Sequence, residues 1–353
     1  YIFPRVLRFL GHFLRSEYGT FSLVSGGSGA FEPIWAVFAD FLKNAFEQSL
    51  VLGAVLAIAA GAIRPRDGRR RTFVLTALLS TLAYLLVFSA RAHLPQGQAL
   101  AWSVLARFWQ QPFLILFFFT GIGFHELFSR LKFPEEKKIS WVVSLFLICA
   151  QMGLNFSRQD QSQEETFVRF GRALLAPLPK DAILLVRGDH FVSSLAYVQH
   201  AEEFRRDIRV LDLETMAYPW FKAKAPAGVE IPGTLYNPFV VDGYDLLKFS
   251  NANLNHAPLF LAGPIRNEDI SLRGKVALWP LGLVQHLIPV GAPLNFPGWE
   301  RKSEEALNRI SNLLKLTIQS SPKTWKEVIA SEAGLAVRRR QAKLAEIHNV
   351  PNQ

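Results

Sequence analysis

Four apolar runs crowd into the first half of this chain, and they constrain its fold more than any other feature. They cover residues 49–63, 72–90, 112–129 and 141–156. A helix that crosses a membrane needs about 20 apolar residues, so the second run is long enough and the other three need flanking residues. Buried helices of a water-soluble protein are the alternative for those three. Because the runs follow one another, we expect a polytopic α-helical membrane region of about four spans over residues 35–156.

The basic residues between these runs predict how such a region would be oriented. The loop at 64–71 carries five arginines, and the loop at 130–138 carries four basic residues against two acidic ones. Loops rich in Lys and Arg stay on the cytoplasmic side of a membrane. We therefore expect residues 1–34, an interfacial segment, and everything after Ser157 to lie on the external or lumenal side.

The charge and the metal-binding residue types exclude several classes of function. The net charge is +10, but the clearest basic cluster, 64–71, lies between two apolar runs, where it is a topology signal. We therefore expect no nucleic-acid partner. The single cysteine, Cys149, leaves no disulfide within the chain. The eight histidines are scattered without the spacing of metal ligands, so we expect neither a metal site nor a cofactor.

The second half of the chain has the pattern of an external α/β domain over residues 157–298. Short apolar or β-branched runs predict strands at 182–186, 208–214, 257–265 and 286–291. A helical pattern between the first two makes a β-α-β unit. Residues 299–353 are expected to form C-terminal helices, which would suit the start of a helical-repeat region.

The turn after the first predicted strand gathers polar residues. Arg187, Asp189 and His190 follow that strand, while Asp212 and Glu214 end the second one. Ligands of open α/β sheets bind in a crevice at the carboxyl ends of the strands. The turn has a single glycine and lacks the spacing of a phosphate-binding loop, which argues against nucleotide binding. We expect these five side chains to line a crevice that holds a ligand or packs against a neighbouring domain.

Several segments together carry a family resemblance. They are "FLGHFLRSEYGTFSL" (9–23), "ARFWQQP" (106–112), the long block at 178–221, "GTLYNP" (233–238) and "ALWPLG" (277–282). The combination resembles the transmembrane protein O-mannosyltransferase family of the GT-C type, which in animals modifies extracellular domains of plexins and receptor kinases, and its bacterial relatives. The block at 178–221 is the most specific part of the likeness.

The resemblance implies a glycosyltransferase that moves mannose from dolichyl- or polyprenyl-phosphate mannose to Ser or Thr hydroxyls of protein acceptors. Its catalytic carboxylate is expected in an external loop upstream of Tyr1, so that this chain would be the C-terminal half and its own catalytic residue is unknown. The enzyme would lie in the endoplasmic reticulum of a eukaryote or the plasma membrane of a bacterium.

Two segments offer residues for the lipid phosphate or the acceptor. The first holds His12, Arg15, Glu17 and Tyr18, and the guanidinium of Arg15 matches phosphate oxygens. An interfacial helix anchored at the headgroups is the alternative.

The second segment holds Arg107, Trp109 and Gln110, where the indole would stack on the sugar. An aromatic-belt Trp with an Arg that reaches toward the interface is the alternative here.

Two other functions compete with transfer. One is a non-enzymatic membrane protein whose external α/β domain binds a polypeptide or glycan. The other is a transporter, which is disfavoured because the apolar runs contain few central polar residues.

Overall fold

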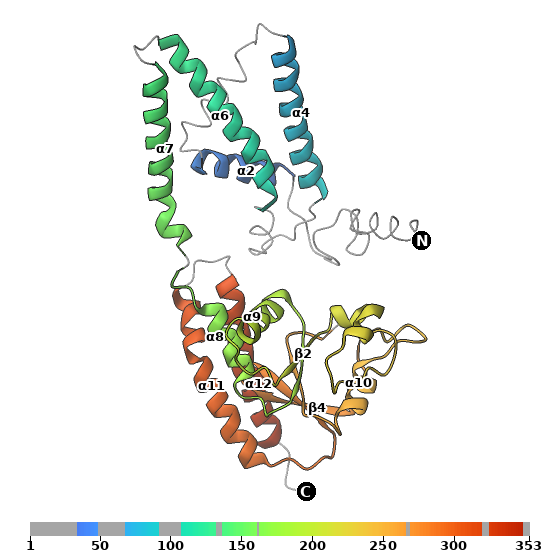
Figure 1. The fold of residues 1–353 in the computed structure, drawn as a ribbon. Helices are drawn as coiled ribbons and strands as arrows, with labels where there is room; N and C mark the ends of the chain where they lie inside the picture. The colour runs from blue at the N-terminus through green and yellow to red at the C-terminus, as the bar shows by residue number, and fades with distance from the viewer. Residues whose placement is uncertain are drawn as a thin grey trace. The chain divides into compact units, whose positions relative to one another are not determined.

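The computed structural model divides the chain into two compact units, Tyr1–Ser162 and Gln163–Gln353 (Figure 1). We call them the first unit and the second unit. The residues that the structure describes are 34–48, 68–91, 107–131, 136–160, 162–265, 269–319 and 325–348.

The described part of the first unit is helical. Its elements are α2 (Ile34–Gln48), α4 (Gly68–Arg91), the short 3-10 helix η1 (Arg107–Trp109), α6 (Gln110–Leu131) and α7 (Glu136–Gln159). A small core joins α2 to the start of α6, where the ring of Phe41 stacks on Phe113 at 5.3 Å and meets the edge of Trp109 at 5.9 Å. These aromatic contacts fix α2 against α6.

The predicted membrane region of about four spans is wrong. Within the described ranges, no helix has both the length and the apolar character needed to cross a bilayer. Helices α4 and α7 open with charged residues, Arg69–Arg71 and Glu136–Lys138. The run at 49–63 lies outside the described residues. The expected orientation depended on these spans and stays a prediction.

The second unit is built on a five-stranded sheet. Its strands are β1 (Ile183–Val186), β2 (Arg209–Asp212), β3 (Leu259–Ala262), β4 (Val276–Leu281) and β5 (Val284–Pro289). Their order is β2-β1-β3-β5-β4. β1 pairs in parallel with both β2 and β3, while β5 is antiparallel to β3 and to β4. The strands predicted at 182–186, 208–214, 257–265 and 286–291 are confirmed as β1, β2, β3 and β5, and β4 was not predicted.

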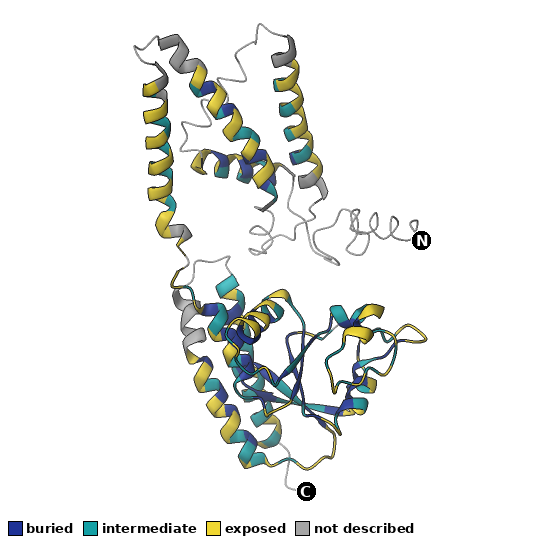
Figure 2. Cartoon of the chain, viewed as in Figure 1, coloured by how far each residue is buried: buried dark blue, intermediate teal, exposed yellow. Residues whose placement is uncertain are grey.

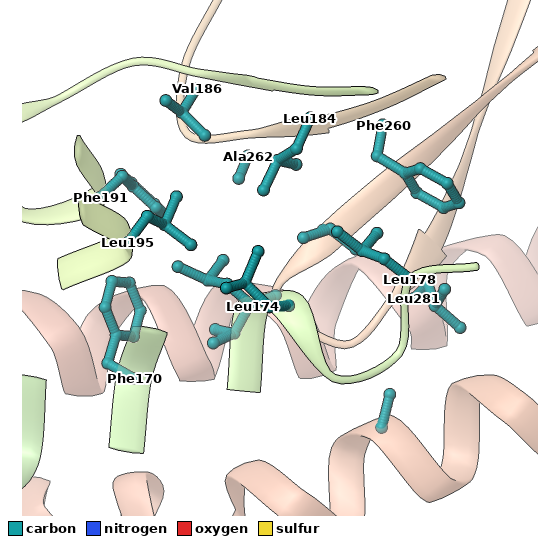
Figure 3. Packing of buried hydrophobic residues seen from close by; sticks show 14 of the residues in the cluster. Phe170, Leu174, Leu178, Leu184, Val186, Phe191, Leu195, Phe260, Ala262 and Leu281 are labelled. Carbon is teal, nitrogen blue, oxygen red and sulfur yellow. The ribbon is translucent and has the colours of Figure 1, made fainter. Parts of the chain in front are cut away.

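Helices cover both faces of this sheet (Figure 2). Leu184 and Val186 of β1 point to a core shared with α8 (Thr166–Leu175), α9 (Asp189–His200), α11 (Phe296–Gln319) and α12 (Trp325–His348). Figure 3 shows Leu184 and Val186 in this cluster with Phe170 and Phe191. Ile183 and Leu185 belong to the opposite core, with α10 (Leu246–Asn253) and the 3-10 helices η2 (Thr215–Ala217) and η3 (Pro219–Lys224). β1 is apolar throughout because both of its faces are buried.

The predicted division into residues 1–34, 35–156, 157–298 and 299–353 stays a prediction. The helices α11 and α12 lie in the second unit and pack against β4.

Candidate functional site at the carboxyl edge of the sheet

The carboxyl ends of β1, β2 and β3 meet at one edge of the sheet. β1 lies between the other two strands, so the chain leaves β1 toward β2 on one side and later returns to β3 on the other. Such a switch in strand order is where open α/β sheets form a ligand crevice. All five residues that the sequence predicted lie at this edge: Arg187 and Glu214 in the turns, Asp189 and His190 at the start of α9, and Asp212 as the last residue of β2.

Two glycines let the turns after β1 and β3 approach each other. Gly188 has φ +114 and Gly263 has φ +83, a region that side chains rarely adopt. A Cβ on Gly263 would lie 2.4 Å from the carbonyl oxygen of Arg187. The amide of Arg187 donates to the carbonyl of Ala262 at 3.2 Å, which ties the two turns together.

An ion pair joins the turns after β1 and β2. Nε of Arg187 donates to Oε1 of Glu214 at 2.5 Å, and the two side chains are 30% and 49% exposed. The pair is therefore partly open to solvent at this edge of the sheet, where a ligand with polar groups can compete for either partner.

Asp212 shapes the turn that carries Glu214. Its two carboxylate oxygens accept from the amides of Glu214 at 3.0 Å and Thr215 at 3.3 Å. Its carbonyl oxygen accepts from the hydroxyl of Thr215 at 2.9 Å. The carboxylate thus holds the first amides of η2, as side chains at helix starts do.

Asp189 and His190 open α9, but neither caps it with a side chain. Gly188 is the residue before the helix, and no side-chain bond caps that end. Asp189 is exposed in the first turn, where its negative charge interacts favourably with the helix dipole. Asp189 therefore contributes its charge to the start of the helix and no side-chain cap.

The ring of His190 is wedged among aromatic side chains. It lies 4.3 Å from the ring of Phe191, 6.0 Å from Phe170 and 5.9 Å from Trp325 of α12. Its Nε2 is buried without a hydrogen-bond partner among the described residues. Burial lowers the pKa of His190, and the charge of Asp189 opposes this only in part. Near neutral pH the ring is therefore uncharged, with a packing role between α9 and α12.

Two of the three acidic side chains at this edge, Asp212 and Glu214, already have partners, while Asp189 is exposed. Glu214 is paired with Arg187, and Asp212 holds two amides. A general base must reach the hydroxyl that it deprotonates. The arrangement suits binding through exposed polar groups better than proton transfer.

The other predicted site residues lie in the first unit. His12, Arg15, Glu17 and Tyr18 are outside the described residues, as is the side chain of Arg107. Trp109 is 4% exposed in the core beside Phe41, and Gln110 is exposed at the start of α6. In the described ranges, no group of three or more His, Cys, Asp or Glu side chains could hold a metal ion.

The sequence analysis missed Asp269, a buried carboxylate that accepts hydrogen bonds from residues around the core between the sheet and α10. Asp269 accepts from the hydroxyl of Tyr236 at 2.9 Å, the amide of Leu246 at 3.0 Å and the hydroxyl of Ser271 at 2.5 Å. These bonds fix the start of α10. The sequence carries no signal for them, since Tyr236 and Asp269 are far apart in the chain.

One protein family matches the segment that carries the residues at this edge of the sheet. The family described as "TMEM260-associated domain 2" matches residues 168–229, a range that holds all five crevice residues. No solved structure matches the chain.

Two curated relatives match most of the chain. "Protein O-mannosyl-transferase tmem260" of Dictyostelium discoideum is 29% identical over 305 residues, which are 80% of this chain and 37% of that protein. "Protein O-mannosyl-transferase TMEM260" of Mus musculus is 29% identical over 340 residues, 92% of this chain and 47% of that protein. The resemblance to protein O-mannosyltransferases is confirmed. The chain spans less than half the length of either relative.

Proposed function

We propose that this chain is part of a protein O-mannosyltransferase. The observation that carries the proposal is its similarity to two curated proteins of that name over 80% and 92% of its residues. The acceptor would be a protein and the donated sugar mannose.

We further propose a lipid-linked donor, dolichyl- or polyprenyl-phosphate mannose. In that reaction a Ser or Thr hydroxyl of the acceptor attacks C1 of the mannose. The bond from C1 to the phosphate oxygen breaks, the lipid phosphate leaves, and a base takes the hydroxyl proton. Such a donor places the enzyme at the endoplasmic reticulum membrane of a eukaryote or the plasma membrane of a bacterium.

The second unit would bind the protein acceptor in this reaction. The support is that Asp212 and Glu214 already accept hydrogen bonds, while the ion pair of Arg187 with Glu214 is partly exposed to solvent. Backbone amides and carbonyls of an extended acceptor can bond with both charges. The reaction's base then belongs to another part of the protein.

The test uses the purified protein, expressed from its complete gene, with an extracellular plexin domain as acceptor. Mannose transfer is followed by mass spectrometry with dolichyl-phosphate mannose or, in parallel, GDP-mannose as donor. Transfer from the lipid donor alone is expected. Transfer from GDP-mannose would contradict the proposal of a lipid-linked donor. Binding of the acceptor without transfer from either donor would favour the alternative function, a non-enzymatic binding protein.

A further inference from the structure

A loop of the second unit exposes three consecutive apolar side chains. Phe239 is 73% exposed, Val240 44% and Val241 99%. They form the tip of the turn between Asn237 and Gly243, which we call the apolar tip. Exposed apolar residues are common singly, but three together at the end of a turn are not explained by the packing of this unit.

The backbone of this loop is held in place. The amide of Phe239 donates to Oδ1 of Asn237 at 3.0 Å, and the amide of Gly243 donates to the carbonyl of Val240 at 2.8 Å. A Cβ on Gly243 would lie 2.2 Å from the carbonyl oxygen of Asn237. Below the turn, the hydroxyl of Thr234 donates to the carbonyl of Asp242 at 2.8 Å. The apolar tip is therefore presented by a fixed turn.

A second exposed segment, η3, packs into the same core as the base of this loop. The amide of Tyr236 donates to the carbonyl of Met216 at 2.8 Å, which joins the base of the loop to η2. Tyr236 and Phe221 of η3 belong to one buried cluster. From η3, Trp220 is 54% exposed, and Lys222 and Lys224 are exposed beside it.

We infer that the apolar tip, with Trp220, Lys222 and Lys224, seats the second unit on an anionic lipid bilayer. Apolar side chains enter the boundary between headgroups and acyl chains, and Trp prefers the headgroup level. Lysines next to them are attracted to anionic headgroups. Asp242 follows the tip and carries a negative charge. Together with Lys222 and Lys224 it leaves a net charge of +1 on this surface.

The size of the surface favours lipid over a protein partner. The three side chains of the tip expose an area on the order of a few hundred Å², whereas a stable protein interface needs about 800 Å² on each side. Insertion into lipid needs no matching groove. This contact goes beyond the proposed transfer reaction, because it requires only a membrane surface.

The test places a fluorescent probe at the tip of the full-length chain. Val241→Cys is labelled with NBD in a Cys149→Ser background, and Asn308→Cys, exposed on α11 at the opposite face of the sheet, is the matched control. Vesicles of phosphatidylcholine with phosphatidylserine are added, some carrying a quencher in the acyl chains. The local probe reports on the loop whatever else in the chain touches lipid.

A blue shift and acyl-chain quenching at position 241, with neither at 308, is the expected result. Lys222→Glu and Lys224→Glu should each weaken vesicle affinity by about fivefold or more. No response at 241, or an equal response at 308, overturns the inference. A response at 241 to the plexin domain but not to vesicles would mean that the loop binds the protein acceptor, and this also overturns the inference.

Discussion

Nε of Arg187 lies 2.5 Å from Oε1 of Glu214, so one ion pair joins the turn after β1 to the turn after β2. Twenty-six residues separate the two in the chain, and only the parallel pairing of β1 with β2 brings them together. Partly exposed pairs of this kind contribute about 1 kcal/mol or less to stability. The pair is therefore better placed to contact a ligand than to hold the fold.

Substitution of this pair should affect acceptor binding more than folding. Arg187→Ala and Glu214→Gln are expected to raise the KM for the protein acceptor by roughly tenfold, the loss of one charged hydrogen bond, with kcat little changed. Urea denaturation should show a loss of about 1 kcal/mol or less. Glu165→Gln, which breaks the exposed pair with Arg169 on α8, is the control and should alter neither. A fall in kcat at unchanged KM would instead give the pair a direct part in the chemistry.

The close approach of the two turns should make Gly263 intolerant of a side chain. Gly263→Ala combines a positive φ with a Cβ 2.4 Å from the carbonyl oxygen of Arg187, so a loss of more than about 3 kcal/mol is expected. Gly274→Ala has a similar φ of +67 with no atom within 4 Å, and should lose only about 1–2 kcal/mol. Chemical denaturation of both variants measures the difference. Equal losses would mean that backbone strain, and not the contact between the turns, sets the cost.

Arg15 stays a predicted contact of the donor phosphate, and it lies outside the described residues. A fixed guanidinium stabilises the negative charge that develops on the leaving phosphate. Arg15→Ala should lower turnover by about 10²–10³-fold, and Arg15→Lys should recover only part because the bidentate geometry is lost. Arg8→Ala is the control and should be tolerated. Wild-type turnover of Arg15→Ala at an unchanged protein level would leave Arg15 as a headgroup anchor.

The strands could be predicted where burial dictates the sequence. β1 reads as a continuous apolar run because it lies between two strands and under helices on both faces. β4 was missed because Pro280 interrupts its pattern. Proline is tolerated in edge strands, and β4 is the edge of this sheet.

The apolar runs of the first unit misled the prediction of its fold. Counting apolar residues ignores where they pack, and Leu85 and Phe113 from two of the runs form a core with Phe41 and Trp109 from outside them. The charged turns at the starts of α4 and α7, which the sequence analysis placed in loops, belong to the helices themselves.

The edge of the sheet that gathers these polar residues could be predicted from the sequence, but their pairings could not. Residues that follow parallel strands must share one edge, which places Arg187 and Glu214 together. Nothing local shows that Asp212 turns back to the amides of its own loop. The strand register and the turn geometry decide such contacts.

The stability of the second unit should fall in mild acid because of His286. This residue lies in β5 with its ring stacked on Phe260 at 4.5 Å. Burial, helped by the nearby charge of Lys302, lowers the pKa of His286 from 6.5 to about 4. The unfolded chain therefore takes up a proton at His286 as the pH falls through 6.5, whereas the folded chain takes it up only near pH 4. The full stability is present above pH 6.5, and the unfolding free energy decreases as the pH falls below that value.

Between pH 7 and 5 this loss should reach about 2 kcal/mol. His286→Phe keeps an aromatic ring on Phe260 and removes the titrating group, so its unfolding free energy should depend less on pH over this range. A residual slope is expected from His190, whose pKa is also lowered by burial. His256→Gln, at an exposed position, is the control and should keep the wild-type slope. Urea denaturation at several pH values measures the unfolding free energy of the wild type and of both variants. An unchanged pH dependence in His286→Phe would show that another group of the unit causes the loss of stability in acid.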